Sequence, residues 1–248
     1  MPDSQRKPIS EFVKVRPSGY AMAYEVKTHG GHLYGISVNQ KLPIVCSVGE
    51  NAKWTLIAAD QGTVLYSGPA QKTWLSSVAF HPGGEGFLIA TADGILQFWS
   101  LRRDDEGTPE TRLRSLSQEH SGAVWSIDWH WAGHCFVTAG LDHLIRLCDP
   151  ERMPMSTSSM ELPKSACQMV LRGHTASVNS ARFVPDGRIL VTASADKSIG
   201  LWDTRTVATK STYLLRDAYR HSCREKDETS LSSYDHMINF RFPKYKLA

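Results

Sequence analysis

Short apolar runs alternate with turn residues in residues 171–203, where the pattern is clearest. The run Ser177–Val184 stops at the Pro-Asp-Gly sequence of residues 185–187, a combination that favours a tight turn. A second apolar run, Ile189–Ala193, is followed by a polar pair and then by a third run, Ile199–Trp202. This pattern predicts three short β-strands joined by two tight turns.

The same pattern recurs with constant spacing. Four units begin and end on positions that lie 28 residues apart: His29 and Ile57, Gln71 and Trp99, His120 and Cys148, His174 and Trp202. Six positions before the end of these units stand, in order, Asn51, Asp93, Asp142 and Asp196. An apolar residue also lies nineteen positions before each end. The coincident columns predict four blades within residues 21–206, over 27–58, 69–100, 118–149 and 172–203.

The fourth unit carries Gly173-His174, Asp196 and Trp202-Asp203, which resemble the signature of the WD repeat (WD40) family. The resemblance implies an all-β fold, a β-propeller in which each repeat supplies four antiparallel strands to one blade. Four units are recognisable, whereas closed propellers of this kind have seven, so we expect an incomplete or partial propeller. A fragment of a longer propeller is favoured over an open arc completed by a partner and over a closed assembly of two copies. Expressed alone, the chain is expected to aggregate or self-associate.

The resemblance also implies a buried hydrogen-bond network of a His, a turn Asp, a strand Ser or Thr and a strand Trp. The matching positions of the fourth unit are His174, Ser194, Asp196 and Trp202. Partial networks are expected from His120 and Asp142, from Thr91, Asp93 and Trp99, and from His29. Gly49, Asn51, Ile57, Gln71, Gly140 and Cys148 interrupt these partial networks. A catalytic dyad of His174 and Asp196 is the alternative, but recurrence favours a structural device, because an active site is needed only once.

Other chemistry-bearing motifs are weak. No Gly-rich phosphate loop, nucleophile elbow or pair of carboxylates is evident, so we assign no catalytic or cofactor-binding residue. His130 and His134 have a spacing that binds zinc on a helix, but here they fall at a strand end and in a turn. Cys135 is interpreted as a small apolar strand residue. We therefore assign no metal site.

Seven tryptophans raise the question of contact surfaces. Trp99 and Trp202 fall in repeat columns, and Trp125 and Trp129 alternate along one strand, which favours burial in the core over stacking on nucleic-acid bases. Trp74 and Trp131 lie in expected turns. They are the candidates for partner contact.

Charge and composition limit the classes of partner. The formal net charge is +3 and the basic residues are scattered, so nucleic acid is not expected. No run of eighteen apolar residues exists, and no membrane span is expected. The start of the chain lacks the apolar core of a secretory signal, and the five cysteines lack CxxC spacing. These features predict reduced thiols and a cytoplasmic protein.

Three segments, Trp74–Pro82, Ala123–His130 and Leu171–Ser180, resemble the WD-repeat subfamily of the ciliary central pair, the sperm-associated antigen type. The resemblance implies a non-enzymatic scaffold for protein–protein interactions in the axonemal central apparatus of cilia or flagella, with axonemal or microtubule-associated partners. A generic WD40 adaptor, such as a ubiquitin-ligase substrate receptor or a trafficking-complex subunit, is the alternative. A propeller hydrolase is the remaining one.

The segments outside the repeats are expected to lack regular structure. Residues 1–20 are polar, and the tail 207–248 is expected to be atypical or disordered, with one strand-like alternation at Ile238–Phe242. The inserts Arg102–Gln118 and Pro150–Cys167 are rich in polar residues and proline. We expect both inserts to be mobile surface loops.

Overall fold

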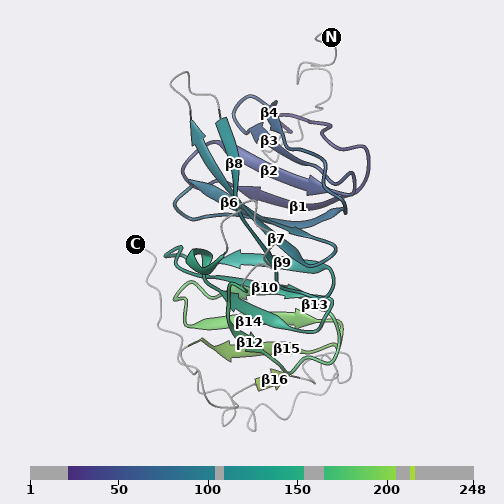
Figure 1. The fold of residues 1–248 in the computed structure, drawn as a ribbon, viewed down its shortest axis with the longest axis vertical. Coiled ribbons are helices and arrows are strands. Elements are labelled where there is room, and N and C mark those ends of the chain that lie inside the picture. The colour runs from purple at the N-terminus through teal and green to yellow at the C-terminus, as the bar shows by residue number, and fades with distance from the viewer. Residues whose placement is uncertain (1–21, 104–108, 154–164, 205–212, 216–248) are drawn as a thin grey trace, which may run out of the picture. The chain divides into compact units, whose positions relative to one another are not determined.

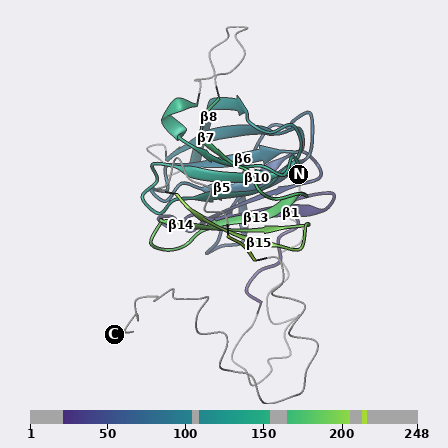
Figure 2. The same cartoon turned by 90° about the horizontal axis from the view of Figure 1, so that it is seen from below.

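The computed structural model describes residues 22–103, 109–153, 165–204 and 213–215. All of them belong to one compact unit, Met1–Arg216. The strands in this part of the chain form four antiparallel sheets of four strands each, and each sheet is built from strands that are consecutive in the sequence (Figures 1 and 2). The four sheets confirm the prediction of an all-β protein with four blades.

The first sheet, blade 1, contains β1 (Leu33–Val38), β2 (Ile44–Gly49), β3 (Trp54–Ala58) and β4 (Thr63–Ser67). Blade 2 contains β5 (Leu75–Phe80), β6 (Gly86–Thr91), β7 (Ile95–Arg103) and β8 (Pro109–Gln118). Blade 3 contains β9 (Val124–Trp129), β10 (Phe136–Gly140), β11 (Ile145–Cys148) and β12 (Cys167–Leu171), with the 3₁₀ turn η2 (Pro150–Arg152) after β11. Blade 4 contains β13 (Val178–Phe183), β14 (Ile189–Ser194), β15 (Ile199–Asp203) and β16 (Tyr213–Leu215).

The turn between the second and third strands of each blade has the same backbone form. The residue five positions before the end of each unit has a left-handed φ: 57° at Ala52, 90° at Gly94, 66° at His143 and 69° at Lys197. In three blades the preceding Asn or Asp closes the turn by accepting the backbone N–H two residues further on. The column of Asn and Asp residues therefore has a local cause, which is the turn itself.

The blades pack against one another in chain order. The first strand of each blade contacts the first strand of the next, from β1 to β5, β9 and β13. Three apolar clusters lie between successive blades, and each combines side chains of two neighbouring blades. The core of the protein is therefore a series of inter-blade layers, as expected for a repeat architecture.

The interpretation of the insert Arg102–Gln118 as a loop is wrong for the parts that the structure describes, because residues 109–118 form β8, the fourth strand of blade 2. Of the insert Pro150–Cys167, the described residues form a 3₁₀ turn and a short irregular segment, and only its last residue, Cys167, belongs to a strand, where it begins β12. Charged residues alternate with covered ones along β8, because the strand lies at the edge of its sheet and its outward side faces solvent. The polar composition concealed this alternation.

The structure also places a strand, β16, inside the tail 207–248. It pairs with β15 and completes the sheet of blade 4. The predictions for residues 1–20 and for Ile238–Phe242 lie outside the described residues. No helix in the described part of the chain is long and apolar enough to cross a membrane.

Candidate functional site

Blade 4 contains a continuous buried hydrogen-bond network. His174 Nδ1 lies 2.9 Å from the Asp196 carboxylate, and His174 Nε2 lies 2.8 Å from the Thr192 hydroxyl. The Trp202 indole N–H donates to the same hydroxyl over 2.9 Å. A single tautomer satisfies every group: the indole donates to Thr192, the hydroxyl donates to Nε2, and Nδ1–H donates to the carboxylate.

The structure brings His174, Asp196 and Trp202 together, but the prediction that Ser194 supplies the hydroxyl is wrong. Ser194 donates to the carbonyl oxygens of Ala176 and Ser177 and accepts the Asp196 N–H, so it supports the turn. The hydroxyl of the network comes from Thr192, two residues earlier on the same face of β14. Alternate residues of a strand share a face, so composition alone could not separate the two positions.

The sheet register explains why Thr192 reaches Trp202. Thr192 lies opposite Gly200 on β15, and Leu190 lies opposite Trp202. A Cβ atom at Gly200 would lie 2.5 Å from the Thr192 hydroxyl and 2.6 Å from the indole nitrogen. Because glycine has no side chain, the indole crosses the strand diagonally to the hydroxyl. In the sequence, the glycine two positions before the Trp was the feature that could have identified Thr192 as the partner of the indole.

Blade 3 joins the same His, Asp and Thr positions but adds a charge. His120 lies 2.9 Å from Asp142 and 2.8 Å from the Thr138 hydroxyl. Arg146 occupies the position that Gly200 has in blade 4, and its Nη1 lies 2.8 Å from both Asp142 and His120 Nδ1. Sequence reasoning missed both Thr138 and Arg146.

The titration of this cluster reflects burial and charge together. Burial lowers the pKa of the His120 imidazole, and this effect exceeds the opposing influence of Asp142. Burial alone would raise the pKa of the Asp142 carboxyl. Hydrogen bonds and charge interactions with His120 and Arg146 outweigh it and hold that pKa well below its usual value.

Blade 2 replaces the network with two glutamines. The Trp99 indole donates to Gln97 over 3.1 Å, and Gln97 donates to Gln71 over 3.0 Å. Thr91 and Asp93 bond to each other at the turn and do not reach Trp99. The structure therefore separates the three residues that the sequence grouped into one partial network.

Blade 1 keeps more of the network than expected. His29 lies 2.7 Å from the Asn51 side-chain oxygen and 3.0 Å from the Ser47 hydroxyl. Ser47 lies ten positions before Ile57, as Thr192 does before Trp202, whereas the sequence interpretation looked at Gly49. A His, an Asp or Asn and a hydroxyl are thus joined in blades 1, 3 and 4, and this recurrence supports a structural role for each of these networks.

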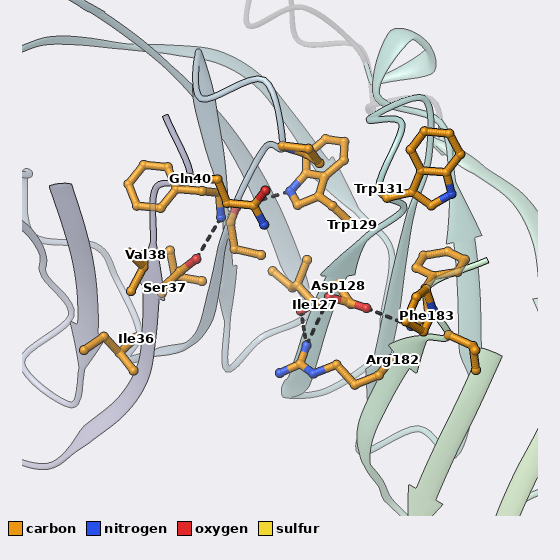
Figure 3. Close-up of a pocket in the computed structure, with 16 residues that line it drawn as sticks. Ile36, Ser37, Val38, Gln40, Ile127, Asp128, Trp129, Trp131, Arg182 and Phe183 are labelled. Atoms are coloured by element: carbon orange, nitrogen blue, oxygen red, sulfur yellow. Dashed lines mark hydrogen bonds and ion pairs between the residues drawn. The ribbon is translucent and has the colours of Figure 1, made fainter. Parts of the chain in front are cut away.

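The candidate partner-binding site is a pocket of about 470 Å³. It lies at the ends of the inner strands, which are the first strands of the four blades, β1, β5, β9 and β13. Figure 3 shows its lining, which comes from all four blades. Its apolar lining consists largely of Ile36, Val38, Val78, Phe80, Ile127, Trp129 and Phe183. The end residues of the four inner strands are the apolar column nineteen positions before each unit end, so one repeat position builds much of the pocket.

Polar groups at the pocket connect neighbouring blades. Asp128 accepts the Phe183 backbone N–H over 2.8 Å, and it pairs with Arg182 at 3.6 Å. Arg182 also donates to the Ile127 carbonyl over 2.7 Å. Burial raises the pKa of Asp128 against the lowering effect of these donors. The Arg182 side chain remains 60% exposed and available to a partner.

The two candidate contact tryptophans differ in their surroundings. Trp131 is 65% exposed and lines the pocket. Trp74 is half-buried, with ring centroids 4.8 Å from Tyr34 and 5.6 Å from Trp125. Tyr34 and Trp125 line a second pocket, of about 310 Å³, at the beginning of the inner strands. Partner contact by either tryptophan stays a prediction, and Trp131 has the geometry that suits it.

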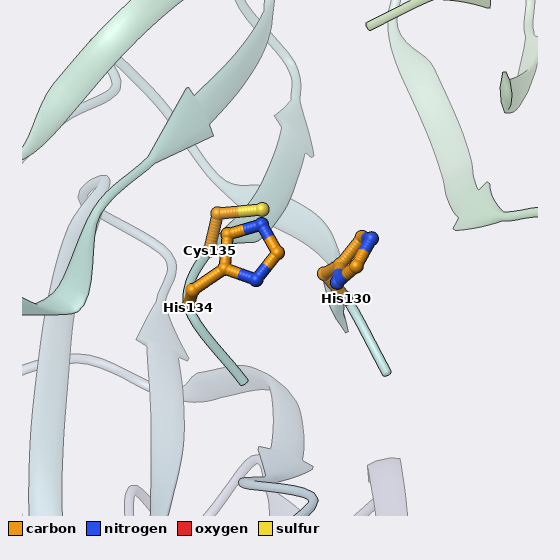
Figure 4. A group of neighbouring side chains, drawn as sticks. All are labelled: His130, His134 and Cys135. Atoms are coloured by element: carbon orange, nitrogen blue, oxygen red, sulfur yellow. The ribbon is translucent and has the colours of Figure 1, made fainter. Parts of the chain in front are cut away.

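His130, His134 and Cys135 form a close group of potential metal ligands (Figure 4). His130 already has structural contacts, because its Nδ1 accepts the Ala132 N–H over 3.2 Å and its Nε2 packs against Gly187. Burial raises the pKa of the Cys135 thiol to about 11. A neutral imidazole whose Nδ1 accepts a hydrogen bond carries its proton on Nε2, so neither ring nitrogen of His130 offers a free lone pair to a metal ion. We therefore interpret His130 as a turn residue.

Comparison with known proteins agrees with the fold. Three segments, residues 61–100, 110–149 and 165–203, match the family model described as WD domain, G-beta repeat. Together with the four sheets, this match defines a four-bladed β-propeller arrangement with WD40 repeats. The chain is a WD40-repeat protein. Proteins of this class are generally non-catalytic interaction scaffolds.

Parts of the chain are also similar to several distantly related proteins, which differ from one another in name. Protein HIRA of Dictyostelium discoideum is 27% identical over 52% of this chain and 12% of its own length. Ribosome biogenesis protein ytm1 of Aspergillus niger is 31% identical over 64% of this chain and 31% of its own length. Pre-mRNA-processing factor 19 of Oryza sativa subsp. japonica is 24% identical over 73% of this chain and 32% of its own length. The chain thus spans a third or less of each, and none of these names is that of a ciliary protein.

Proposed function

We propose that this WD40-repeat protein is a non-enzymatic scaffold that holds a protein partner at the pocket between the inner strand ends. The observation that carries the proposal is Trp131, a 65% exposed indole at a pocket whose lining combines apolar side chains with the exposed Arg182. Trp and Arg are the residues in which binding energy concentrates at protein interfaces. The partner that suits this chemistry is a peptide segment with an apolar anchor and an acceptor for the guanidinium.

The pocket favours binding over catalysis. Among the described residues that line it, Asp128 is the one carboxylate. Asp128 is occupied by the Phe183 N–H and by Arg182, and its side chain joins two blades. A hydrolase would need a second acid or a nucleophile beside it, and we therefore propose no reaction at this site.

The location that we propose is the axonemal central apparatus of motile cilia or flagella. Its support is the resemblance of Trp74–Pro82, Ala123–His130 and Leu171–Ser180 to WD-repeat proteins of that structure. Partners would then be axonemal or microtubule-associated proteins.

Affinity purification from isolated axonemes tests both parts of the proposal. The protein serves as bait, beside Trp131→Ala and a control, Leu141→Ala, whose exposed side chain does not line the pocket. We expect one set of axonemal proteins with the unaltered bait and with the control, and a recovery about 10-fold lower with Trp131→Ala. Equal recovery with Trp131→Ala would contradict the pocket. Recovery only from soluble extracts of non-ciliated cells would contradict the location and favour the adaptor alternative.

A further inference from the structure

Two cysteines of blade 3 lie opposite each other on neighbouring strands. Cys148 ends β11 and Cys167 begins β12, and the register of the sheet pairs the two residues. The register shifts by one residue at this point, so the pairing skips Gln168. Without this bulge, Cys148 would lie opposite the Gln168 amide. The bulge therefore brings a second thiol to the position that faces Cys148.

The two sulfur atoms are in contact. They lie within 4.8 Å of each other, and a hydrogen bond joins the Cys148 and Cys167 side chains. The Cys167 sulfur also donates to the Met169 carbonyl over 3.2 Å, which holds its side chain in place. Opposite residues of antiparallel strands have Cα atoms about 4.5–5.5 Å apart, and disulfides span Cα separations of about 4.4–6.8 Å. A disulfide here therefore needs rotation of two side chains and no rearrangement of the sheet.

The two thiols have different surroundings. Cys148 is fully buried in the apolar cluster between blades 2 and 3, whereas Cys167 is partly exposed. The hydrogen bond from Cys148 lowers the pKa of the Cys167 thiol, and the same bond together with burial raises the pKa of the Cys148 thiol. Cys167 is therefore the thiol that ionises and meets solvent, and Cys148 stays protonated beside it.

The polar groups around the pair favour thiol chemistry over metal binding. The Glu119 carboxylate lies within 4.8 Å of both sulfur atoms, but it accepts the Ser165 hydroxyl over 2.7 Å and the Ala166 N–H over 2.6 Å. The Ser117 hydroxyl donates to it as well. Among the described residues, this group of two thiols and one occupied carboxylate is one ligand short of a closed tetrahedral zinc site.

We propose that Cys167 and Cys148 are a redox-active pair, in which a hydroperoxide oxidises Cys167 and Cys148 then closes a disulfide between β11 and β12. The Cys167 thiolate attacks one peroxide oxygen and the O–O bond breaks, so Cys167 becomes a sulfenic acid and the other oxygen takes up a proton and leaves as an alcohol or water. The Cys148 sulfur then attacks the Cys167 sulfur, the S–O bond breaks, and the hydroxyl leaves with the Cys148 proton as water. Two electrons pass from the thiols to the peroxide. The new bond cross-links the edge strand of blade 3 to its neighbour.

Peptide mapping of the oxidised 248-residue chain tests the pair. Tryptic cleavage places Cys148 in the peptide 147–152 and Cys167 in the peptide 165–172. After treatment with hydrogen peroxide and blocking of the remaining thiols, we expect these two peptides to be joined in the non-reduced digest and separate after reduction. Cys135→Ser is the matched control, because Cys135 is another free thiol of blade 3 outside the pair, and it should leave the linkage unchanged.

Two further variants separate the roles of the thiols. Cys148→Ser removes the second step, so dimedone should trap the sulfenic acid on Cys167 about 10-fold more than in the unaltered chain. Cys167→Ser removes the first step, so Cys148 should remain an unmodified thiol under the same oxidant, because it is buried and protonated. Circular dichroism of each variant checks that the fold is kept.

Four outcomes would overturn the proposal. Cys167 could be oxidised to a sulfinic acid without any linked peptides, which would mean that Cys148 does not reach it. Both thiols could resist the peroxide, or the disulfide could join other cysteines. Dimedone could also label Cys148 in the Cys167→Ser variant, which would reverse the two roles. None of these readouts depends on the partner pocket, so the proposed function is tested separately.

Discussion

Blades 3 and 4 place a His, an Asp and a Thr in the same geometry and complete the network differently. In blade 4 the position opposite the threonine is Gly200, and the free space admits the Trp202 indole. In blade 3 that position is Arg146, whose guanidinium bonds to the carboxylate and the imidazole instead. One cross-strand position therefore determines whether the network ends in a neutral donor or in a charge.

The difference has energetic consequences. In the network of blade 4 the one charged member is the Asp196 carboxylate, so the removal of that residue leaves only neutral groups behind. A buried charged pair is costly to break, because the surviving charge stays desolvated. Blade 3, for which the sequence predicted only a partial network, should therefore be more sensitive to the loss of its carboxylate.

The largest expected effect is the loss of Asp142. Asp142→Ala leaves Arg146 and His120 without their shared acceptor and should lower the free energy of unfolding by about 3 kcal/mol or more. Asp196→Ala should cost about 1–3 kcal/mol, and Asp93→Ala about 1–2 kcal/mol less than that, because Asp93 is exposed and its network lacks the His. Urea unfolding of the three variants measures this order. A larger loss for Asp196→Ala than for Asp142→Ala would contradict the role given to Arg146.

The second comparison concerns the two candidate hydroxyls of blade 4. Thr192→Val removes the partner of both Trp202 and His174 and should cost about 2–3 kcal/mol, because two buried polar groups lose their bond. Ser194→Ala removes only turn bonds and should cost about 1 kcal/mol. The same unfolding measurement decides between them. If the serine variant were the less stable one, the network would run through Ser194 after all.

The smallest expected effect is a pH dependence that belongs to blade 3. The pKa of His120 is lowered in the folded protein, so the unfolded chain binds the additional proton first as the pH falls. The stability that depends on neutral His120 is therefore complete above about pH 6.5, the unfolded value, and decreases as the pH falls below it, by up to about 1.4 kcal/mol per pH unit. His120→Gln should flatten this part of the stability profile between about pH 6.5 and 5. A profile that is unchanged by the substitution would assign the pH dependence to other groups.

The accuracy of the sequence interpretation varied with the range of the interactions. The repeat period, the turn columns and the pairing of His174 with Asp196 depend on residues that recur at fixed separations. The fourth strands of blades 2 and 3 were missed, because β8 and β12 lie at sheet edges where one side is polar. The Gln97 and Arg146 substitutes were missed because each bonds to a residue 26 positions earlier in the sequence, Gln71 and His120 respectively.

The sequence by itself determined the four repeats, their turns and the all-β architecture, since each depends on alternation and turn chemistry within one short segment. The tertiary structure decided that Thr192, and not Ser194, joins Trp202, because that bond depends on which residue lies opposite Gly200. It also decided that Ile36 and Ile199 are exposed while their equivalents are buried. Equivalent residues have the same local structure, but their burial depends on whether a neighbouring blade covers them, which no local pattern encodes.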